Sequence, residues 1–165
     1  MENKCASPVL NKKERNPIVI SPSTPGGAIL IAEDNPDDAY LIKRAVRKLL
    51  PNPIHLAKDG YEAIAYVRGD GELQDRARFP YPDLLLLDLR MPNLDGFEVL
   101  RWLQSMKRTH SVLTVVLSAT REMRELSDAY KLGANSFLPK PISSAELKVT
   151  LEAWSFQSKG KIKNA

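Results

Sequence analysis

The sequence predicts an α/β fold with a doubly wound parallel sheet and helices on both of its faces. Short apolar segments typical of buried strands alternate with segments whose apolar residues recur at helical spacing, and this alternation occurs five times. Parallel strands are joined by crossover helices, so the alternation favours a parallel sheet. Apolar residues make up 43% and charged residues 27% of the 165 residues, which fits one globular domain and excludes a collagen-like, coiled-coil or wholly disordered chain.

Five segments have the character of strands. The leucine run at 84–87, between Asp83 and Asp88, is the strongest of them. A continuous apolar run of this length indicates a strand that is buried on both faces. The predicted strands are 28–32, 54–57, 84–88, 112–117 and 136–138.

A helix is predicted after each strand. Pro36 opens the first helix, and Pro51 stops it after Leu50 because proline interrupts helical hydrogen bonding. Ser143 and Glu146 have the spacing of a capping box at the start of the last helix. The predicted helices are 36–50, 61–67, 96–103, 123–132 and 143–154, with Leu147, Val149, Leu151 and Trp154 as the apolar stripe of the last one; residues 69–82 are a predicted polar loop.

Composition and charge divide the chain into three parts. Residues 1–27 are rich in proline and carry a net charge of +2, and residues 155–165 contain three lysines and no acid. We therefore expect a flexible basic extension at 1–27, a domain at 28–154 with a net charge of −1, and a short basic tail at 155–165. Basic ends of this kind can contact nucleic acid, but they are more often solvated termini, so nucleic-acid binding is not expected.

Several classes of protein are excluded by what the chain lacks. One cysteine, Cys5, allows no intramolecular disulfide and no cysteine-based zinc site. His55 and His110 have no partner at metal-ligand spacing, which favours structural or surface roles for both. No apolar run is long enough to cross a bilayer, and the first ten residues do not have the pattern of a secretory signal, so we expect a cytoplasmic protein.

Charged and hydroxyl side chains follow four of the five predicted strands. Glu33 and Asp34 follow the first strand, and Asp88 ends the third. Ser118 follows the fourth strand and Lys140 follows the fifth. Because the carboxyl ends of the strands of a doubly wound sheet open onto one crevice, we expect these five side chains to share a site.

The residue types in this predicted site indicate phosphoryl transfer. Three neighbouring carboxylates repel one another unless they are protonated or bridged by a cation. Magnesium binds one or two carboxylates and uses phosphate oxygens as further ligands, and Lys140 adds a positive charge for the same oxygens. An aspartate carboxylate can accept a phosphoryl group covalently. The set therefore predicts Mg²⁺-dependent transfer of a phosphoryl group to an aspartate.

Four motifs resemble those of the receiver domains of two-component response regulators. They are ILIAEDNP at 29–36, PDLLLLDLRMPNLDG at 82–96, VVLSA at 115–119 and GANSFLPKP at 133–141, and the resemblance covers residues 28–154. The loop at 69–83 and the run at 96–103 resemble the small stand-alone regulators that include the phytochrome-linked type. The resemblance implies a flavodoxin-like (βα)5 fold with strands in the order 2-1-3-4-5.

The resemblance also implies a role for each residue of the predicted site. Asp88 is the implied phosphoacceptor, and Lys140, before an implied cis bond to Pro141, pairs with the phosphate. The implied Mg²⁺ ligands are Asp34, Glu33 through water, Asp88 and the main-chain carbonyl of Arg90. Ser118 is implied to bond a phosphoryl oxygen, Phe137 to be the aromatic switch, and Arg90 and Thr120 to tune the lifetime of the phosphate.

Three positions depart from the commoner residues of the family. Glu33 stands where aspartate is commoner, and Ser118 stands where threonine is frequent. Phe137 replaces the frequent tyrosine, so no hydroxyl is present there for a contact in the active state. These departures bear on the strength of switching and leave the acceptor chemistry intact.

The partners implied by the resemblance are proteins. A sensor histidine kinase or a histidine phosphotransfer protein supplies the phosphoryl group, and a downstream protein binds the face formed by the fourth helix, fifth strand and fifth helix. Homodimerisation on phosphorylation is a further outcome of this kind of switch. The domain is expected to act as a phosphoacceptor rather than as an enzyme. The eleven residues after Trp154 are too few for a DNA-binding output domain, which favours a stand-alone receiver.

Three alternative functions remain to be weighed against this one. A phosphatase of the haloacid-dehalogenase type needs a second aspartate two residues beyond Asp88, and that position is Arg90. A pseudo-receiver would keep the fold without being phosphorylated, but Asp88, Ser118 and Lys140 are all present. A nucleic-acid-binding protein would use the basic ends, and its affinity would fall steeply with salt.

Overall fold

The computed structural model describes residues 27–106, 112–119 and 122–153. Nearly all of the predicted extension and the whole of the predicted tail lie outside these residues, as do Cys5, His110, Thr120 and Trp154. Within the described residues, no helix is both long enough and apolar enough to cross a membrane.

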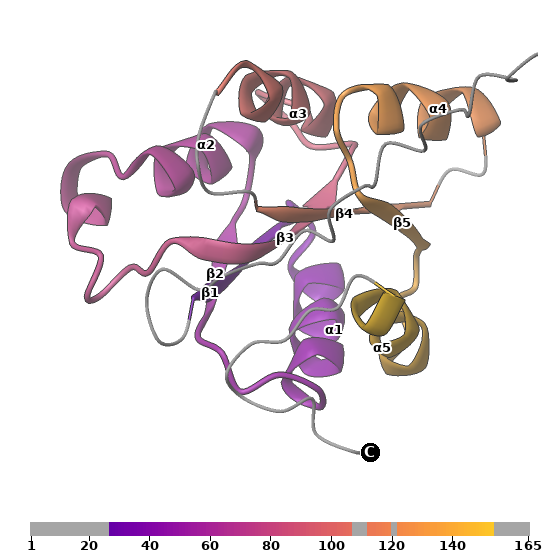
Figure 1. The fold of residues 1–165 in the computed structure, drawn as a ribbon, viewed down its shortest axis with the longest axis horizontal. Coiled ribbons are helices and arrows are strands. Elements are labelled where there is room, and N and C mark those ends of the chain that lie inside the picture. The colour runs from indigo at the N-terminus through magenta and orange to yellow at the C-terminus, as the bar shows by residue number, and fades with distance from the viewer. Residues whose placement is uncertain (1–26, 107–111, 120–121, 154–165) are drawn as a thin grey trace, which may run out of the picture.

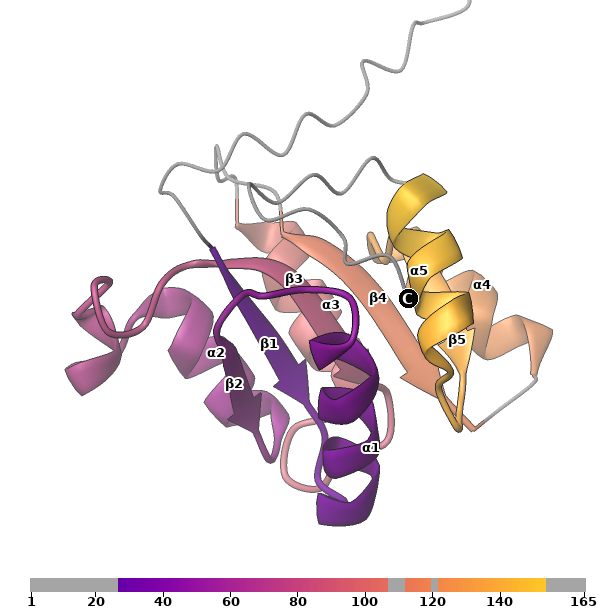
Figure 2. The ribbon, with the colours of Figure 1, turned by 90° about the horizontal axis from the view of Figure 1, so that it is seen from below.

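The described residues contain one sheet of five strands, all of them paired in parallel (Figures 1 and 2). The strands lie in the order β2-β1-β3-β4-β5, which confirms the predicted fold class. Their bounds are β1 Ala28–Ala32, β2 Ile54–Ala57, β3 Pro82–Asp88, β4 Leu113–Ser118 and β5 Ser136–Pro139.

Helices cover both faces of the sheet. The helix α1 and the helix α5 lie on one face, and α2, α3 and α4 lie on the other (Figure 1). Each face buries its own apolar cluster, because the alternating side chains of β1 and β3 point to opposite sides of the sheet. The bounds are α1 Pro36–Arg47, α2 Gly60–Arg68, α3 Gly96–Ser105, α4 Met123–Lys131 and α5 Ser144–Ala153, and a short 3₁₀ helix, η1, covers Gly71–Gln74.

Two helix predictions were wrong in detail. The first helix ends at Arg47, three residues before the predicted end at Leu50. Leu49 and Leu50 lie in the turn that follows the helix, are buried in the core, and both donate their amides to the carbonyl of Val46, so the apolar spacing continues past the last helical residue. Val149 is exposed over 66% of its surface and does not belong to the buried stripe of α5.

The connection between α2 and β3 contains structure that the sequence did not predict. The 3₁₀ helix η1 begins a segment in which the guanidinium of Arg76 donates to the carbonyls of Tyr66 and Val67, at 3.0 Å and 2.9 Å. These carbonyls belong to the last turn of α2, where no helical partner is available. Arg76 therefore satisfies the end of α2 and holds the segment over it.

His55 of β2 packs beneath the same segment. Its ring lies 5.0 Å from the ring of Tyr66 and 5.6 Å from that of Phe79, measured between centroids. Its Nε2 atom is buried and has no hydrogen-bond partner among the described residues. Burial lowers the pKa of the His55 imidazole, because the surroundings favour the neutral ring over the charged one.

We expect His55 to make the protein less stable in weak acid. The unfolded chain protonates this imidazole near the ordinary His pKa of about 6.5, whereas the folded chain resists protonation until a lower pH. The contribution to stability is therefore fully present above about pH 6.5 and is lost as the pH falls from there toward the lower pKa of the folded state. Urea unfolding of the wild type and of His55→Phe between about pH 7 and about pH 5.5 measures the difference. The wild type should lose stability more steeply than the variant, and parallel pH profiles would contradict the assignment.

Candidate functional site

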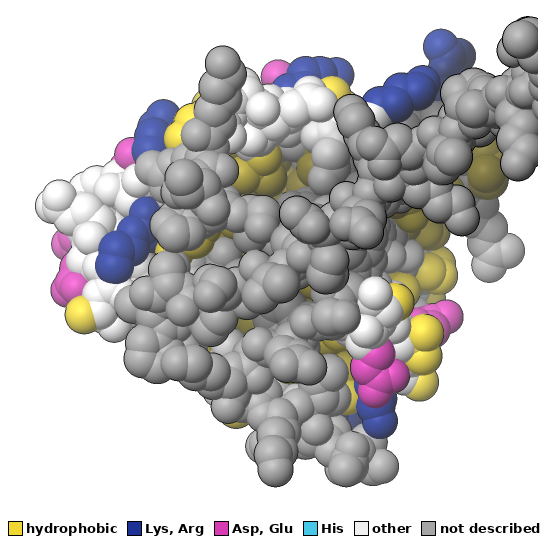
Figure 3. Space-filling view, in the orientation of Figure 1, with side chains coloured by type: hydrophobic (Ala, Val, Ile, Leu, Met, Phe, Trp, Pro, Cys, Tyr) yellow, Lys and Arg dark blue, Asp and Glu magenta, His cyan; other side chains and the backbone are white. Residues whose placement is uncertain are grey.

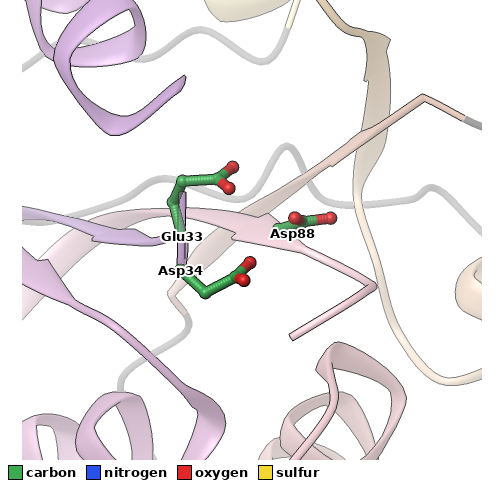
Figure 4. A group of neighbouring side chains, drawn as sticks. All are labelled: Glu33, Asp34 and Asp88. Carbon is green, nitrogen blue, oxygen red and sulfur yellow. The ribbon is translucent and has the colours of Figure 1, made fainter. Parts of the chain in front are cut away.

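The carboxyl ends of β1 and β3 bring three carboxylates together. Glu33 and Asp34 follow β1, and Asp88 is the last residue of β3. One carboxylate oxygen from each lies within 4.8 Å of the other two (Figure 4). The β1–β3 pairing sets Ala32 beside Leu87, so the acidic side chains emerge at the same level of the sheet.

Lys140 completes this cluster from the end of β5. Its Nζ lies 2.6 Å from Glu33 Oε2 and 2.9 Å from Asp88 Oδ2. The side chains of Glu33 and Asp88 are only 1% and 8% exposed, so both ion pairs are shielded from water. The peptide bond between Lys140 and Pro141 is cis, as the resemblance implies. The structure thus joins Lys140, Glu33 and Asp88 by ion pairs, with Asp34 close to the two carboxylates.

Asp38 is a member of the cluster that the sequence analysis missed. Its Oδ2 lies 3.2 Å from Lys140 Nζ, as a third carboxylate on that ammonium. Asp38 lies in the first turn of α1, where its amide donates to the capping side chain of Asn35. The sequence analysis considered only the residues that follow the strands. Because α1 begins four residues after β1 ends, its first turn lies at the same end of the sheet as the carboxyl ends of the strands.

Burial and the neighbouring charges both shift the pKa values of Lys140 and Glu33. Burial by itself would lower the pKa of Lys140, but hydrogen bonds and charge attraction from Glu33 and Asp88 outweigh it and raise that pKa, so the ammonium stays charged. Burial raises the pKa of Glu33, with a further increase from the nearby Asp88 charge and a partial offset from Lys140. One ammonium therefore does not fully compensate the clustered carboxylates.

Arg90 contributes its backbone to the site and directs its side chain elsewhere. Its N–H donates to Asp88 Oδ1 at 3.1 Å, whereas Lys140 bonds the other oxygen, Oδ2. The guanidinium is exposed and pairs with Glu125 of α4. Two residues beyond Asp88 the chain therefore carries a guanidinium that pairs with α4, and not the second aspartate that a phosphatase of the haloacid-dehalogenase type needs.

Ser118 lies at the end of β4, and Phe137 lies on β5 before Lys140. Ser118 ends β4, is 1% exposed, and accepts the amide of Lys140 on its carbonyl at 3.0 Å. Phe137 is half-buried on β5 and packs against the apolar cluster on the α2–α3–α4 face of the sheet. The two residues therefore lie on neighbouring strands of the sheet, of which β5 is the edge strand.

The cluster fits a divalent cation. Glu33, Asp34 and Asp88 converge on a small volume at the surface, with Asp34 exposed and the other two buried. Two further charged groups are nearby: the carboxylate of Asp38 and the ammonium of Lys140, which among the described residues is the one ammonium paired with the cluster. Four carboxylates against one ammonium leave an excess of negative charge that a hard divalent cation neutralises, and oxygen ligands are the ligands that such ions prefer.

The strand order together with this carboxylate cluster defines a doubly wound α/β domain able to bind a divalent cation at its switch point. The chain belongs to the response regulator receiver domain family, whose model matches residues 29–152. It is therefore a receiver domain, the signalling domain of two-component regulatory systems, and the predicted family is confirmed.

Relatives of known sequence and structure agree with this assignment. The chain is 38% identical over 125 residues to the probable methanogenesis regulatory protein FilR2 of Methanothrix harundinacea, covering 75% of this chain and 78% of that protein. It is 29% identical over 119 residues to the response regulator Rcp1 of Synechocystis sp., covering 72% and 79% respectively. Rcp1 has also been solved in a Mn²⁺-bound form, with a TM-score of 0.66 at 27% identity over 84% of this chain and 99% of that one.

Two phytochrome response regulators show the same fold. The bacteriophytochrome response regulator AtBRR has a TM-score of 0.71 at 31% identity, covering 85% of this chain and 99% of that one. The phosphorylated cyanobacterial phytochrome response regulator RcpA has a TM-score of 0.66 at 30% identity, covering 84% and 99%. This chain is thus homologous to the phytochrome-associated response regulators.

Proposed function

We propose that Asp88 accepts a phosphoryl group from a phosphohistidine on a sensor histidine kinase or a histidine phosphotransfer protein, in the presence of Mg²⁺. The observation that carries the proposal is the position of Lys140 Nζ, which contacts both Asp88 and Glu33 at a cluster of converging carboxylates. An acceptor carboxylate beside a shielded ammonium and a cation site contains the parts that phosphoryl transfer needs.

The proposed transfer is a single displacement at phosphorus. A carboxylate oxygen of Asp88 attacks the phosphorus atom, the phosphorus–nitrogen bond breaks, and the imidazole nitrogen keeps the electron pair and takes up a proton. Lys140 stays charged and holds a phosphoryl oxygen, and the Arg90 N–H orients the Asp88 carboxylate. Glu33, Asp34, Asp88 and the Arg90 carbonyl would hold the Mg²⁺, which when bound neutralises charge on the phosphoryl oxygens.

The consequence of phosphorylation is proposed to be a change in protein binding. Ser118 would hydrogen-bond a phosphoryl oxygen, and Phe137 would change its packing in response. The surface formed by α4, β5 and α5 exposes three large apolar side chains, those of Met123, Tyr130 and Val149. Apolar and acidic side chains lie side by side over α5 (Figure 3). Exposed apolar groups of this size support a protein partner or a second copy of the chain.

The same proposal places the protein in the cytoplasm as a signalling acceptor without a separate substrate. The test is the intact mass of the full chain after incubation with acetyl phosphate, with and without Mg²⁺. A phosphoryl adduct that requires Mg²⁺ supports the proposal. Absence of the adduct under both conditions, together with failure to bind beryllofluoride, would favour a receiver fold that is not phosphorylated.

A further inference from the structure

The loop between β3 and α3 determines where Arg90 lies. This loop, residues 89–95, carries the Arg90 N–H that bonds Asp88 Oδ1 and the Arg90 carbonyl proposed as a cation ligand. Both groups belong to the backbone, so their positions depend on the path of the loop. The Arg90 side chain does not place these two groups; the path of the loop backbone does.

One bond within the loop joins its two ends, and a second closes a tight turn around Asn93. The amide of Gly96 donates to the carbonyl of Leu89 at 3.1 Å, and the amide of Leu94 donates to Pro92 at 2.8 Å. A Cβ at Gly96 would lie 2.3 Å from the carbonyl oxygen of Asp88, so the returning chain passes directly against the end of β3. Between these ends Asn93 has a φ of 66°, a left-handed conformation that non-glycine residues seldom adopt.

The start of α2 supplies the remaining support. Asn93 Nδ2 donates to Asp59 Oδ2 at 2.9 Å, across 34 positions of the sequence. The amide of Gly60 donates to the carbonyl of Leu94 at 3.0 Å, and a Cβ at Gly60 would lie 2.5 Å from the same oxygen. The N-terminus of α2 and the middle of the loop are therefore in direct contact, with no space for a side chain between them.

Asp59 divides its two oxygens between two tasks. Its Oδ1 caps α2 by accepting a hydrogen bond of 2.9 Å from the Glu62 backbone N–H. Its Oδ2 accepts the hydrogen bond from Asn93 Nδ2. Asp59 as a residue is 7% exposed. The hydrogen bond from the Glu62 amide, and after it the one from the Asn93 side chain, lowers the pKa of Asp59, so its side chain remains a charged acceptor. Bonds to a charged acceptor are stronger than neutral ones, which suits a fixed attachment point.

We infer that Asp59 and Asn93 are positioning residues for phosphoryl transfer: they brace the β3–α3 loop so that the Arg90 backbone meets Asp88 and the cation. The inference rests on the proposed function for its consequence in phosphorylation. It assigns to α2, which contributes no group to the site itself, the task of fixing one wall of that site.

Two substitutions remove the brace and leave the neighbouring structure intact. Asn93→Gly deletes the amide group, and glycine adopts the positive φ without strain. Asp59→Ser keeps a good helix cap for the Glu62 amide but is too short to reach Asn93. The matched control is Asn52→Gly, which deletes a side-chain amide hydrogen bond of 2.7 Å to the carbonyl of Gly27, at the amino ends of β1 and β2 and so at the opposite end of the strands from the site.

The measurement is Mg²⁺ binding to the full chain by titration calorimetry, well below the unfolding temperature of each variant. Asn93→Gly and Asp59→Ser should each raise the Kd for Mg²⁺ about fivefold, the factor expected from one hydrogen bond of ordinary net strength. The double variant should bind no more weakly than the weaker single variant, since both changes remove the same bond. Asn52→Gly should bind like the wild type.

Equal Mg²⁺ affinity in Asn93→Gly, Asp59→Ser and Asn52→Gly would overturn the inference, even if all three were less stable than the wild type. The proposed function fails by a different result, namely a wild type that binds Mg²⁺ but forms no phosphoryl adduct. A wild type that binds no Mg²⁺ would overturn both.

Discussion

Asp88→Asn is expected to form no phosphoryl adduct with acetyl phosphate and Mg²⁺, a complete loss relative to the wild type. The asparagine amide keeps the size of the side chain and can still accept from the Arg90 N–H. It is not a nucleophile at oxygen under these conditions, so the loss follows from the missing carboxylate rather than from misfolding. Intact mass spectrometry of both proteins under identical conditions measures the effect.

Asp83→Asn is the matched control for this experiment. Asp83 lies on the same strand as Asp88 but at the opposite end, beside Gly27, so the substitution is chemically identical and distant from the site. The control should form the adduct as the wild type does. If Asp88→Asn retained the adduct in full, the phosphoryl group would be on another residue and the assignment of Asp88 as acceptor would be wrong.

Lys140→Met is expected to lower the free energy of unfolding by about 3 kcal/mol in the absence of divalent cations, because it leaves the shielded carboxylates of Glu33 and Asp88 without their counter-charge. Burial already raises the pKa of Glu33, and removal of the ammonium that offsets this raises it further, so the loss should grow as the pH rises and shrink in weak acid. Mg²⁺ should recover part of it, since a bound cation replaces some of the missing charge. Urea unfolding at two pH values, with and without Mg²⁺, measures each effect.

Lys148→Met provides the comparison for a lysine outside the site. Its Nζ is 4.0 Å from Glu152 within α5, and an ion pair of that kind at the surface contributes little to stability. We expect a change below about 1 kcal/mol for this variant. A Lys140→Met protein as stable as Lys148→Met would show that the carboxylate cluster does not depend on Lys140.

The sequence predicted the sheet well because its strands are short and the three central ones, β1, β3 and β4, are buried on both faces. The leucine run at 84–87 is fully buried in β3, and the polar residues that end β1 and β3 meet where the parallel arrangement requires. Strand ends in a doubly wound sheet have little freedom, so the residue types at 33, 34, 88 and 140 were enough to indicate a shared site. The same reasoning could not find Asp38, because it considered strand ends and not the first turns of helices.

Helix limits were predicted less well than strands. Leu49 and Leu50 continue the apolar spacing of α1 although the helix has already ended, and Val149 continues that of α5 although it faces solvent. Apolar spacing reports which residues can be buried, whereas the end of a helix depends on which carbonyls find other partners.

The sequence alone determined the order of the elements, the family and the residue types at the ends of the strands. These depend on local patterns of polarity and on contiguous sequence motifs. Tertiary structure decided the contacts between distant segments: Lys140 with Asp38, Arg90 with Glu125, and Asp59 with Asn93. Each of these pairs joins residues at least 34 positions apart. Their contact depends on how helices pack on the two faces of the sheet, and no local pattern records that packing.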